Sequence, residues 1–168
     1  MKKIFLLLLL SVIMSHGKAQ DHAWAFGFNG DVQLESPDYQ GAFGIQGKYD
    51  FAKHSAIQAQ VYGRNGYVAV GADYLLSLLD KTRSNFNVFI GGGVSQDFYR
   101  YNELMADQEQ VLPERRENFT IMNGQVGVSY YFSAANLSLY TGYKLKYNLE
   151  WEETQPNYLM FGVRYHLW

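Results

Sequence analysis

Residues 24–34 read WAFGFNGDVQL, and the order of residue types in this stretch decides the fold. Its even-numbered positions are mostly large and apolar, as at Trp24 and Phe28, whereas its odd-numbered positions are small or polar, as at Asp31. Successive side chains of a β-strand point to opposite faces, so this alternation predicts a strand with one apolar face and one polar face.

The same alternation recurs in later segments of the chain. These segments are residues 42–51, 56–62, 68–76, 86–96, 122–132, 137–149 and 158–168. Most have about 9–12 residues, the length with which a tilted strand crosses a bilayer. With the first segment they make an even number of strands. The pattern therefore predicts an all-β fold, an eight-stranded antiparallel up-and-down transmembrane β-barrel.

The connections between these segments sort into two sets that alternate along the chain. One set, of moderate or short length, is 50–55, 77–85 and 133–136. The other set is 35–41, 63–66, 97–119 and 150–157, in which 97–119 is the longest. Membrane barrels combine short periplasmic turns with longer external loops. We therefore expect the first strand to start in the periplasm and the second set of connections to face the outside of the cell.

Composition narrows the function classes. The chain has 168 residues, a one-domain length, and contains no cysteine, which excludes a disulfide framework, a thiolate metal site and a cysteine nucleophile. Its net charge is −2, so it has no basic excess to hold a nucleic acid, and we expect no nucleic-acid partner. The high aromatic content of 17%, with only 3 prolines, suits long strands.

The N-terminus has the organisation of a secretory signal peptide. Lys2 and Lys3 precede an apolar stretch over residues 4–14, and the small residues Gly17 and Ala19 follow. About 11 apolar residues are too few for a membrane helix, which needs about 20. We expect residues 1–19 to be removed and residues 20–168 to form the barrel.

The composition of the two faces indicates which one is outside. The polar face is rich in small polar residues, which fit the inside of a narrow barrel, and the apolar face carries no charge in any strand core. A soluble calyx, the alternative, would need a charged exterior. Aromatic residues are expected to gather at the periplasmic end as an interfacial girdle. They are Trp24, Phe26, Tyr49, Phe51, Tyr74, Phe86, Tyr130, Phe132 and Tyr165.

Residues 162–168 read GVRYHLW. Together with the signal peptide and the eight alternating segments, this ending resembles the small outer-membrane barrel proteins of Gram-negative bacteria, of the OmpX and OmpA-barrel type. The resemblance covers the whole mature chain. It implies that Tyr165, Leu167 and Trp168 form the signal read by the barrel-assembly machinery. Trp168 is one residue out of phase with the outward alternation, which leaves open whether Leu167 or Trp168 is the terminal recognition residue.

Two narrower resemblances concern the source of the chain. The cleavage site at Ala19-Gln20 resembles that of precursors from Bacteroidota. A weaker resemblance, over residues 74–101 and the last segment, is to the TraO-type conjugative-transposon proteins of that phylum.

Six charged residues fall on the face expected to point inward. They are Asp31, Lys48, Asp73, Lys144, Lys146 and Arg164. One interpretation is a lined pore; the other is a paired polar network that plugs the lumen. Buried charges must pair, and an eight-stranded barrel encloses little more than its own side chains, so we expect the plug.

Some small barrels are enzymes, such as lipid A-modifying enzymes and omptin proteases. A resemblance to them would imply a catalytic histidine near the outer rim of this chain. The mature chain has His22, His54 and His166, all expected at the periplasmic end. The triplet at residues 91–93 is glycine only and lacks the lysine of a phosphate loop. We therefore expect no catalytic residue, no metal site and no cofactor.

The long external connection contains apolar and arginine residues, the usual anchors of an interface. Those expected to carry a surface interaction are Tyr99, Tyr101, Leu104, Met105, Arg115 and Arg116. The expected partners are outer-membrane lipid and lipopolysaccharide, the barrel-assembly machinery and a surface protein. The sequence thus predicts a non-enzymatic outer-membrane barrel with a structural or surface-interaction role. The alternatives are a TraO-like conjugative-transfer barrel, a lipid-modifying membrane enzyme and a soluble periplasmic ligand-binding barrel.

Overall fold

The structure is a computed structural model that describes residues 23–34, 39–81, 83–101 and 115–167. It contains eight strands in chain order: β1 (Trp24–Gln33), β2 (Gly41–Ala52), β3 (Ser55–Arg64), β4 (Tyr67–Ser77), β5 (Phe86–Tyr101), β6 (Arg115–Phe132), β7 (Leu137–Asn148) and β8 (Glu153–Leu167). Within the described ranges, no helix is long and apolar enough to span a membrane.

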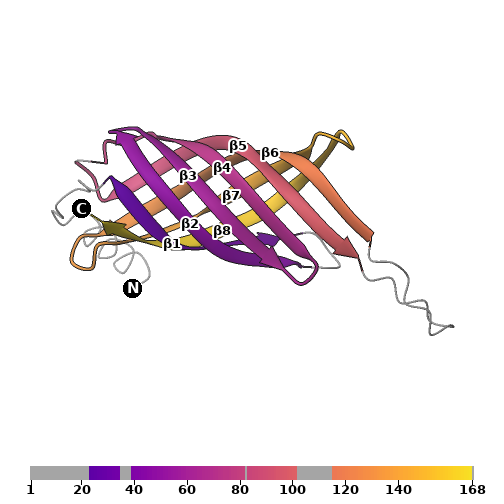
Figure 1. Ribbon diagram of the computed structural model, residues 1–168. Coiled ribbons are helices and arrows are strands. Elements are labelled where there is room, and N and C mark those ends of the chain that lie inside the picture. Colours follow the sequence, from indigo (N-terminus) through magenta and orange to yellow (C-terminus); the bar gives the residue numbers. More distant parts are fainter. Residues whose placement is uncertain (1–22, 35–38, 82, 102–114, 168) are drawn as a thin grey trace, which may run out of the picture.

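Each strand pairs antiparallel with its neighbours in sequence, and β1 pairs with β8 to close the barrel (Figure 1). The predicted all-β, eight-stranded antiparallel up-and-down barrel is confirmed. The start of β1 and the end of β8 lie at the same end of the barrel, which we call the inner end; the opposite end is the outer end.

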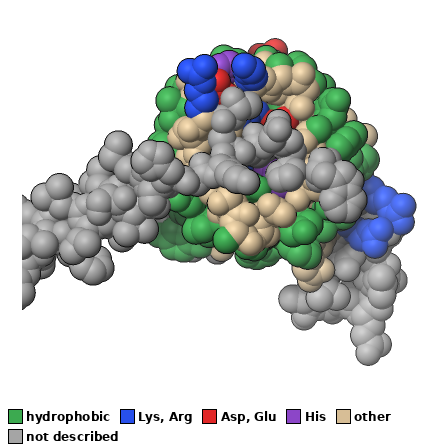
Figure 2. Space-filling view, turned by 90° about the vertical axis from the view of Figure 1, so that its left-hand side faces the viewer, with side chains coloured by type: hydrophobic (Ala, Val, Ile, Leu, Met, Phe, Trp, Pro, Cys, Tyr) green, Lys and Arg blue, Asp and Glu red, His purple; other side chains and the backbone are tan. Residues whose placement is uncertain are grey.

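The two faces of the wall have the polarity that the alternation predicts. Phe28 points outward and is 67% exposed, whereas Asp31 points inward and is 3% exposed. Apart from the extended tips of β5, β6 and β8, no outward-facing position in the described strands carries a charge. Figure 2 views the inner end and shows hydrophobic side chains around the outside of the wall. The barrel is therefore apolar outside and polar inside, the reverse of a soluble protein.

Two predicted connections are shorter than expected. Residues 97–101 continue β5, residues 115–119 begin β6, and β8 starts at Glu153, so the predicted loops 97–119 and 150–157 were both too long. The alternation continues through these strand ends, with Asp97 buried and Phe98 exposed. The sequence did not predict these strand ends, because polar residues such as Arg100 and Asn118 occupy their outward face. The apolar periodicity is therefore lost there, although the backbone pairing continues.

Gly93 shows what the glycine triplet does. Its inward face lies against β4, where an added Cβ would come within 2.1 Å of the Ala72 carbonyl oxygen and 2.3 Å of Asp73 Oδ1. Because Gly93 has no side chain, the Asp73 side chain of β4 can lie directly against the backbone of β5. This agrees with a close-packing role for the glycine.

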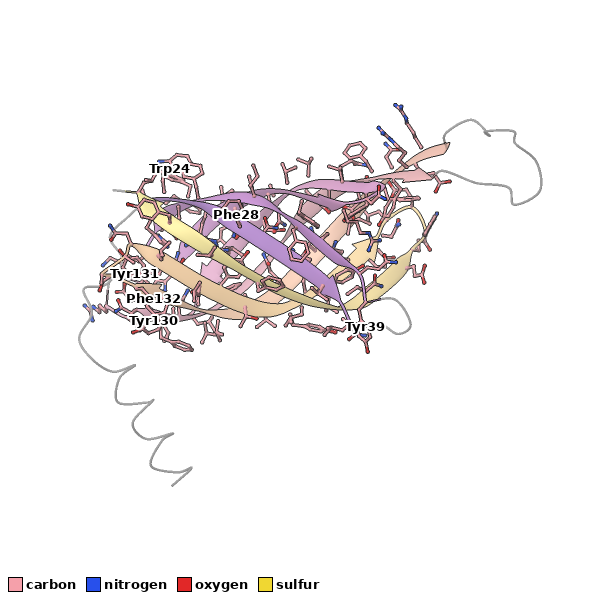
Figure 3. The ribbon with its side chains drawn as sticks, turned by 90° about the horizontal axis from the view of Figure 1, so that it is seen from below. Trp24, Phe28, Tyr39, Tyr130, Tyr131 and Phe132 are labelled. Carbon is pink, nitrogen blue, oxygen red and sulfur yellow. The ribbon has the colours of Figure 1, made fainter. Side chains whose placement is uncertain are left out.

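Aromatic residues gather at the inner end. Figure 3 shows Trp24, Tyr130 and Phe132 there, with Tyr39 at the outer end. The ring centroids of Trp24 and Tyr49 are 4.5 Å apart, and those of Tyr130 and Phe132 are 4.8 Å apart. These outward-facing rings form a band around the end at which the chain enters the barrel.

Candidate functional site

The centre of the lumen holds a buried ion pair. Lys144 Nζ lies 2.7 Å from Asp31 Oδ2, and both side chains are almost fully buried. β1 and β7 supply the two residues, and the pairing falls across the interior because both positions are on the inward face. In a low-dielectric interior, each charge requires the other.

Arg164 fills the lumen beside this pair. Its Nη2 donates to Gln58 Oε1 at 2.5 Å, and its Nε donates to Gln46 Oε1 at 3.2 Å. The guanidinium carbon lies 3.9 Å from the ring centroid of Tyr140, which donates from its hydroxyl to the same Gln46 oxygen at 3.1 Å. Amides and a ring thus hold this cation.

Lys146 lies closer to the outer end, among three tyrosine rings. Its Nζ is 5.0, 5.8 and 4.6 Å from the ring centroids of Tyr62, Tyr67 and Tyr158, respectively. It donates to the Tyr67 hydroxyl at 3.3 Å and lies 4.0 Å from Asp97 Oδ2. The Tyr67 hydroxyl in turn donates to Asp97 at 2.7 Å.

The second predicted acid, Asp73, accepts a hydrogen bond from Gln60 Nε2 at 2.8 Å and is 2% exposed. All six predicted interior charges therefore point into the barrel. The structure brings Asp31 and Lys144 into direct contact, whereas Lys48, Lys146 and Arg164 contact residues outside the predicted set.

At the inner end, Asp50 joins two lysines. Its Oδ2 lies 2.7 Å from Lys48 Nζ, and its Oδ1 accepts a hydrogen bond from Lys81. Lys81 comes from the connection between β4 and β5, yet it is only 5% exposed. We call these three residues the charged plug. Figure 2 shows basic, acidic and histidine side chains gathered at the upper edge of this end.

The described histidines also lie at the inner end. His166 points inward, shares a 2.8 Å hydrogen bond with Ser138 Oγ and lies edge-on to Tyr131 with 5.0 Å between ring centroids. His54 is exposed, and its Nδ1 lies 2.9 Å from the Ser77 carbonyl oxygen. His22 lies outside the described residues. In the described part of the chain, no group of three or more histidine and acidic side chains converges on a metal position.

At the outer end, inward-facing rings of the strands continue to the exposed ring of Trp151 on the turn between β7 and β8. The centroids of Tyr67 and Tyr99 are 4.8 Å apart, those of Tyr99 and Phe119 are 5.8 Å apart, and those of Phe119 and Trp151 are 4.4 Å apart. We call these four residues the aromatic row. A cavity beside it, between Arg64, Lys146 and Tyr158, has a volume of only about 20 Å³, room for about one water molecule.

The turn that carries Trp151 is fixed to β6. The backbone N–H of Thr120 donates to both carboxylate oxygens of Glu150 at 2.9 Å. These hydrogen bonds hold the pKa of Glu150 below its usual range, because they favour the ionised carboxylate.

The residues predicted for a surface interaction lie in different parts of the structure. Tyr99 lies in β5 and not in a loop, and its ring packs against that of Tyr67 inside the mouth; its role in a surface interaction stays a prediction. Arg116 is exposed on β6, opposite Arg100 of β5. Tyr101 ends β5 and Arg115 begins β6. Leu104 and Met105 lie outside the described residues.

The predicted assembly signal lies on β8 beside the start of β1. Tyr165 is outward and about half exposed, and Leu167 is partly buried and in register with Trp24. Trp168 lies outside the described residues.

Sequence reasoning missed three charged partners. Asp97 is two residues after Ser95 and therefore shares its inward face. The alternation would have identified Asp97 as an interior residue if the predicted strand had continued beyond residue 96. Asp50 lies on the same strand as Lys48, two residues away, and so shares its face. Lys81 gives no such signal, because a lysine in a polar connection is normally solvated.

Among solved structures, the chain is similar to the N-terminal β-barrel domain of Pseudomonas aeruginosa OprF, seen in a crystal structure, with a TM-score of 0.67 and 14% sequence identity. The alignment covers 89% of this chain and 99% of that domain. At this identity the likeness concerns the fold, and it agrees with the expected resemblance to small outer-membrane barrels. No protein-family model and no curated protein matches the chain.

Proposed function

We propose that the chain is an outer-membrane β-barrel of a Gram-negative bacterium, with a structural or cell-surface role and no catalytic function. The observation that carries this proposal is the inverted polarity of the wall, with Phe28 exposed outside and Lys144 buried inside. In lipid such an outer surface is required, because a lysine or arginine at the bilayer midplane costs about 2–4 kcal/mol. In water it would form a continuous apolar belt and aggregate.

This polarity argues against the soluble periplasmic alternative. The position of the histidines argues against the lipid-modifying enzyme: His54 and His166 lie at the inner end, about the full length of the barrel from the outer rim. The TraO-like role and an origin in Bacteroidota rest on the sequence resemblances alone and are tested by the genes that neighbour this one.

A closed lumen is the second element of the proposal. Lys144, Lys146 and Arg164 each occupy the interior with their partners, and the cavity beside Lys146 holds about one water. We expect the purified protein to give no large, stable current steps in planar lipid bilayers. Reproducible porin-like steps would contradict the closed lumen and favour a transport role.

Membrane placement is tested by fractionation. We expect the mature protein, beginning at Gln20, in the outer membrane, inserted by the barrel-assembly machinery and in contact with lipid and lipopolysaccharide. A folded barrel resists unfolding by detergent, so unboiled and boiled samples should migrate differently on gels. Recovery of the protein in the soluble periplasmic fraction would reject the proposal.

The surface role is tested by shortening the connection between β5 and β6. Replacement of residues 102–114 with a short Gly-Ser linker should leave the difference in gel migration unchanged, because loop length has a small effect on stability. It should abolish whole-cell binding to the surface partner. If the shortened protein inserts and binds as the wild type does, the surface interaction lies elsewhere.

A further inference from the structure

Buried apolar side chains meet inside the barrel and pack against one another. They come from β3, β4, β5, β7 and β8, and none is more than 6% exposed. We call them the apolar layer, which consists of Ala56, Leu75, Phe89, Tyr140 and Met160. The rings of Phe89 and Tyr140 meet edge-on, with 6.4 Å between their centroids. Because these side chains point into the lumen, they are buried by one another and by the wall, and not by lipid.

Glycines on neighbouring strands make room for the apolar layer. A Cβ added at Gly91 would lie 2.6 Å from Leu75 Cδ2. One added at Gly127 would lie 2.7 Å from Phe89 Cζ. Two further contacts of the same kind join Gly142 to Met160 and Gly162 to Tyr140. These distances are too short for a real Cβ, so each large side chain extends into the lumen across a strand position that has no side chain.

Polar residues flank the apolar layer on both sides along its strands. On β4 the successive inward positions toward the inner end are Asp73, Leu75 and Ser77. On β5, the inward position next to Phe89 on its inner side is Asn87, which donates to Ser77 Oγ at 2.9 Å. The apolar layer therefore separates the polar centre of the lumen from the polar groups of the inner end.

Beside the apolar layer, the lumen is occupied by Arg164 and Gln46. The Arg164 guanidinium lies over the Tyr140 ring, and the Gln46 Oε1 atom accepts hydrogen bonds from both of these residues. The amide nitrogen of Gln46 donates to the Phe28 carbonyl oxygen at 2.9 Å. These hydrogen bonds fix both side chains to the wall and to the edge of the apolar layer.

We propose that the apolar layer is the barrier that closes the barrel to ions, and that the ion pairs on its two sides do not set this barrier. An ion that enters an apolar constriction loses its hydration and gains no polar partner in exchange. Narrow apolar constrictions also close pores by excluding water. A polar region offers fixed charges and amides to a passing ion, so it is the weaker obstacle. This inference rests on the closed lumen of the proposed function and names the side chains that close it.

The test measures ion current through the purified mature protein in planar lipid bilayers. The variant Leu75→Thr/Phe89→Thr removes two large apolar side chains and adds hydroxyl groups, and threonine is well suited to strands. We expect it to give discrete current steps that the wild type lacks. A second variant, Phe89→Thr/Met160→Thr, opens the apolar layer from β5 and β8 and should also conduct, so the test does not depend on the folding of one variant.

The matched control is Asp31→Thr/Lys144→Thr, which makes the same kind of change at the central ion pair and removes both of its charges together. It should stay as silent as the wild type. All variants are first checked for heat-dependent gel migration. Silent folded variants of the apolar layer, or equal current steps in the control, would overturn the proposal. Current steps in the wild type would instead contradict the closed lumen itself, and a wild type without heat-dependent migration would contradict the membrane placement.

Discussion

At the inner end of the barrel, Asp50 accepts hydrogen bonds from both Lys48 and Lys81; at the outer end, the rings of Tyr99 and Phe119 line the mouth. The inner end is thus fixed by a shared carboxylate, and the outer end by packed apolar area. Removal of a charge leaves its partners buried and uncompensated, whereas removal of a ring leaves a space that neighbours can partly fill. The two ends should therefore respond differently to comparable substitutions.

The largest effect is expected from Asp50→Asn. It leaves the Lys48 and Lys81 ammonium groups without their carboxylate, and removal of one partner from a buried pair costs about 3–5 kcal/mol. The measurement is the free energy of unfolding in urea, with the protein in lipid vesicles. The double variant Asp50→Asn/Lys81→Met removes one of the two ammonium groups and should recover part of the loss.

Lys53→Gln serves as the control for the inner end, because Lys53 is an exposed lysine on the neighbouring turn, and it should leave stability unchanged. If Asp50→Asn is as stable as the wild type, the charged plug does not hold the inner end.

A smaller effect is expected from Phe119→Ala at the outer end. The substitution removes ring contacts with Tyr99 and Trp151, and we expect a loss of about 2–3 kcal/mol, below the cost of a fully enclosed phenylalanine, because the mouth can collapse around the space. The same unfolding measurement applies. Phe98→Ala, on the outward face one position from the pairing partner of Phe119, should cost less; equal losses would mean that the aromatic row adds nothing beyond lipid contact.

The smallest effect concerns Glu150, whose carboxylate accepts from the Thr120 N–H. Because its pKa is lowered in the folded protein, this contribution is complete above the pKa of the unfolded chain and is lost as the pH falls through the folded pKa. Trp151 fluorescence, in a Trp24→Phe/Trp168→Phe background, should therefore change at acidic pH. In Glu150→Gln the acidic transition should be absent; a transition that persists would assign it to another group.

The interior of the barrel was more predictable than its ends. A period of two places Lys144 and Asp31 on the same face as their small polar neighbours. A shift of one residue would exchange the two faces of each strand, so that the charges would point outward and the apolar side chains into the lumen. The partners of these interior charges were harder to predict from the sequence. Pairing across the lumen depends on barrel stagger, which the order of residues in one strand does not contain.

At the ends, the pattern that identifies a strand changes with the surroundings. Arg100 and Asn118 face outward on paired strands, but above the apolar band an outward side chain need not be hydrophobic. Lys81 shows the converse case. A connection of ordinary polar composition folds over the inner end of the barrel, and only the three-dimensional path of its backbone makes Lys81 a buried residue.

The β1–β8 seam has a consequence for how the molecule assembles. Every other pairing joins neighbouring segments of the chain, but the seam brings Trp24 beside Leu167. Closing a long loop costs more entropy than closing a hairpin, and distant pairings form slowly. We therefore expect the sheet to form one hairpin at a time, with the β1–β8 pairing as the last step. Until then β1 and β8 are open edges, and an open edge pairs with whatever strand it meets.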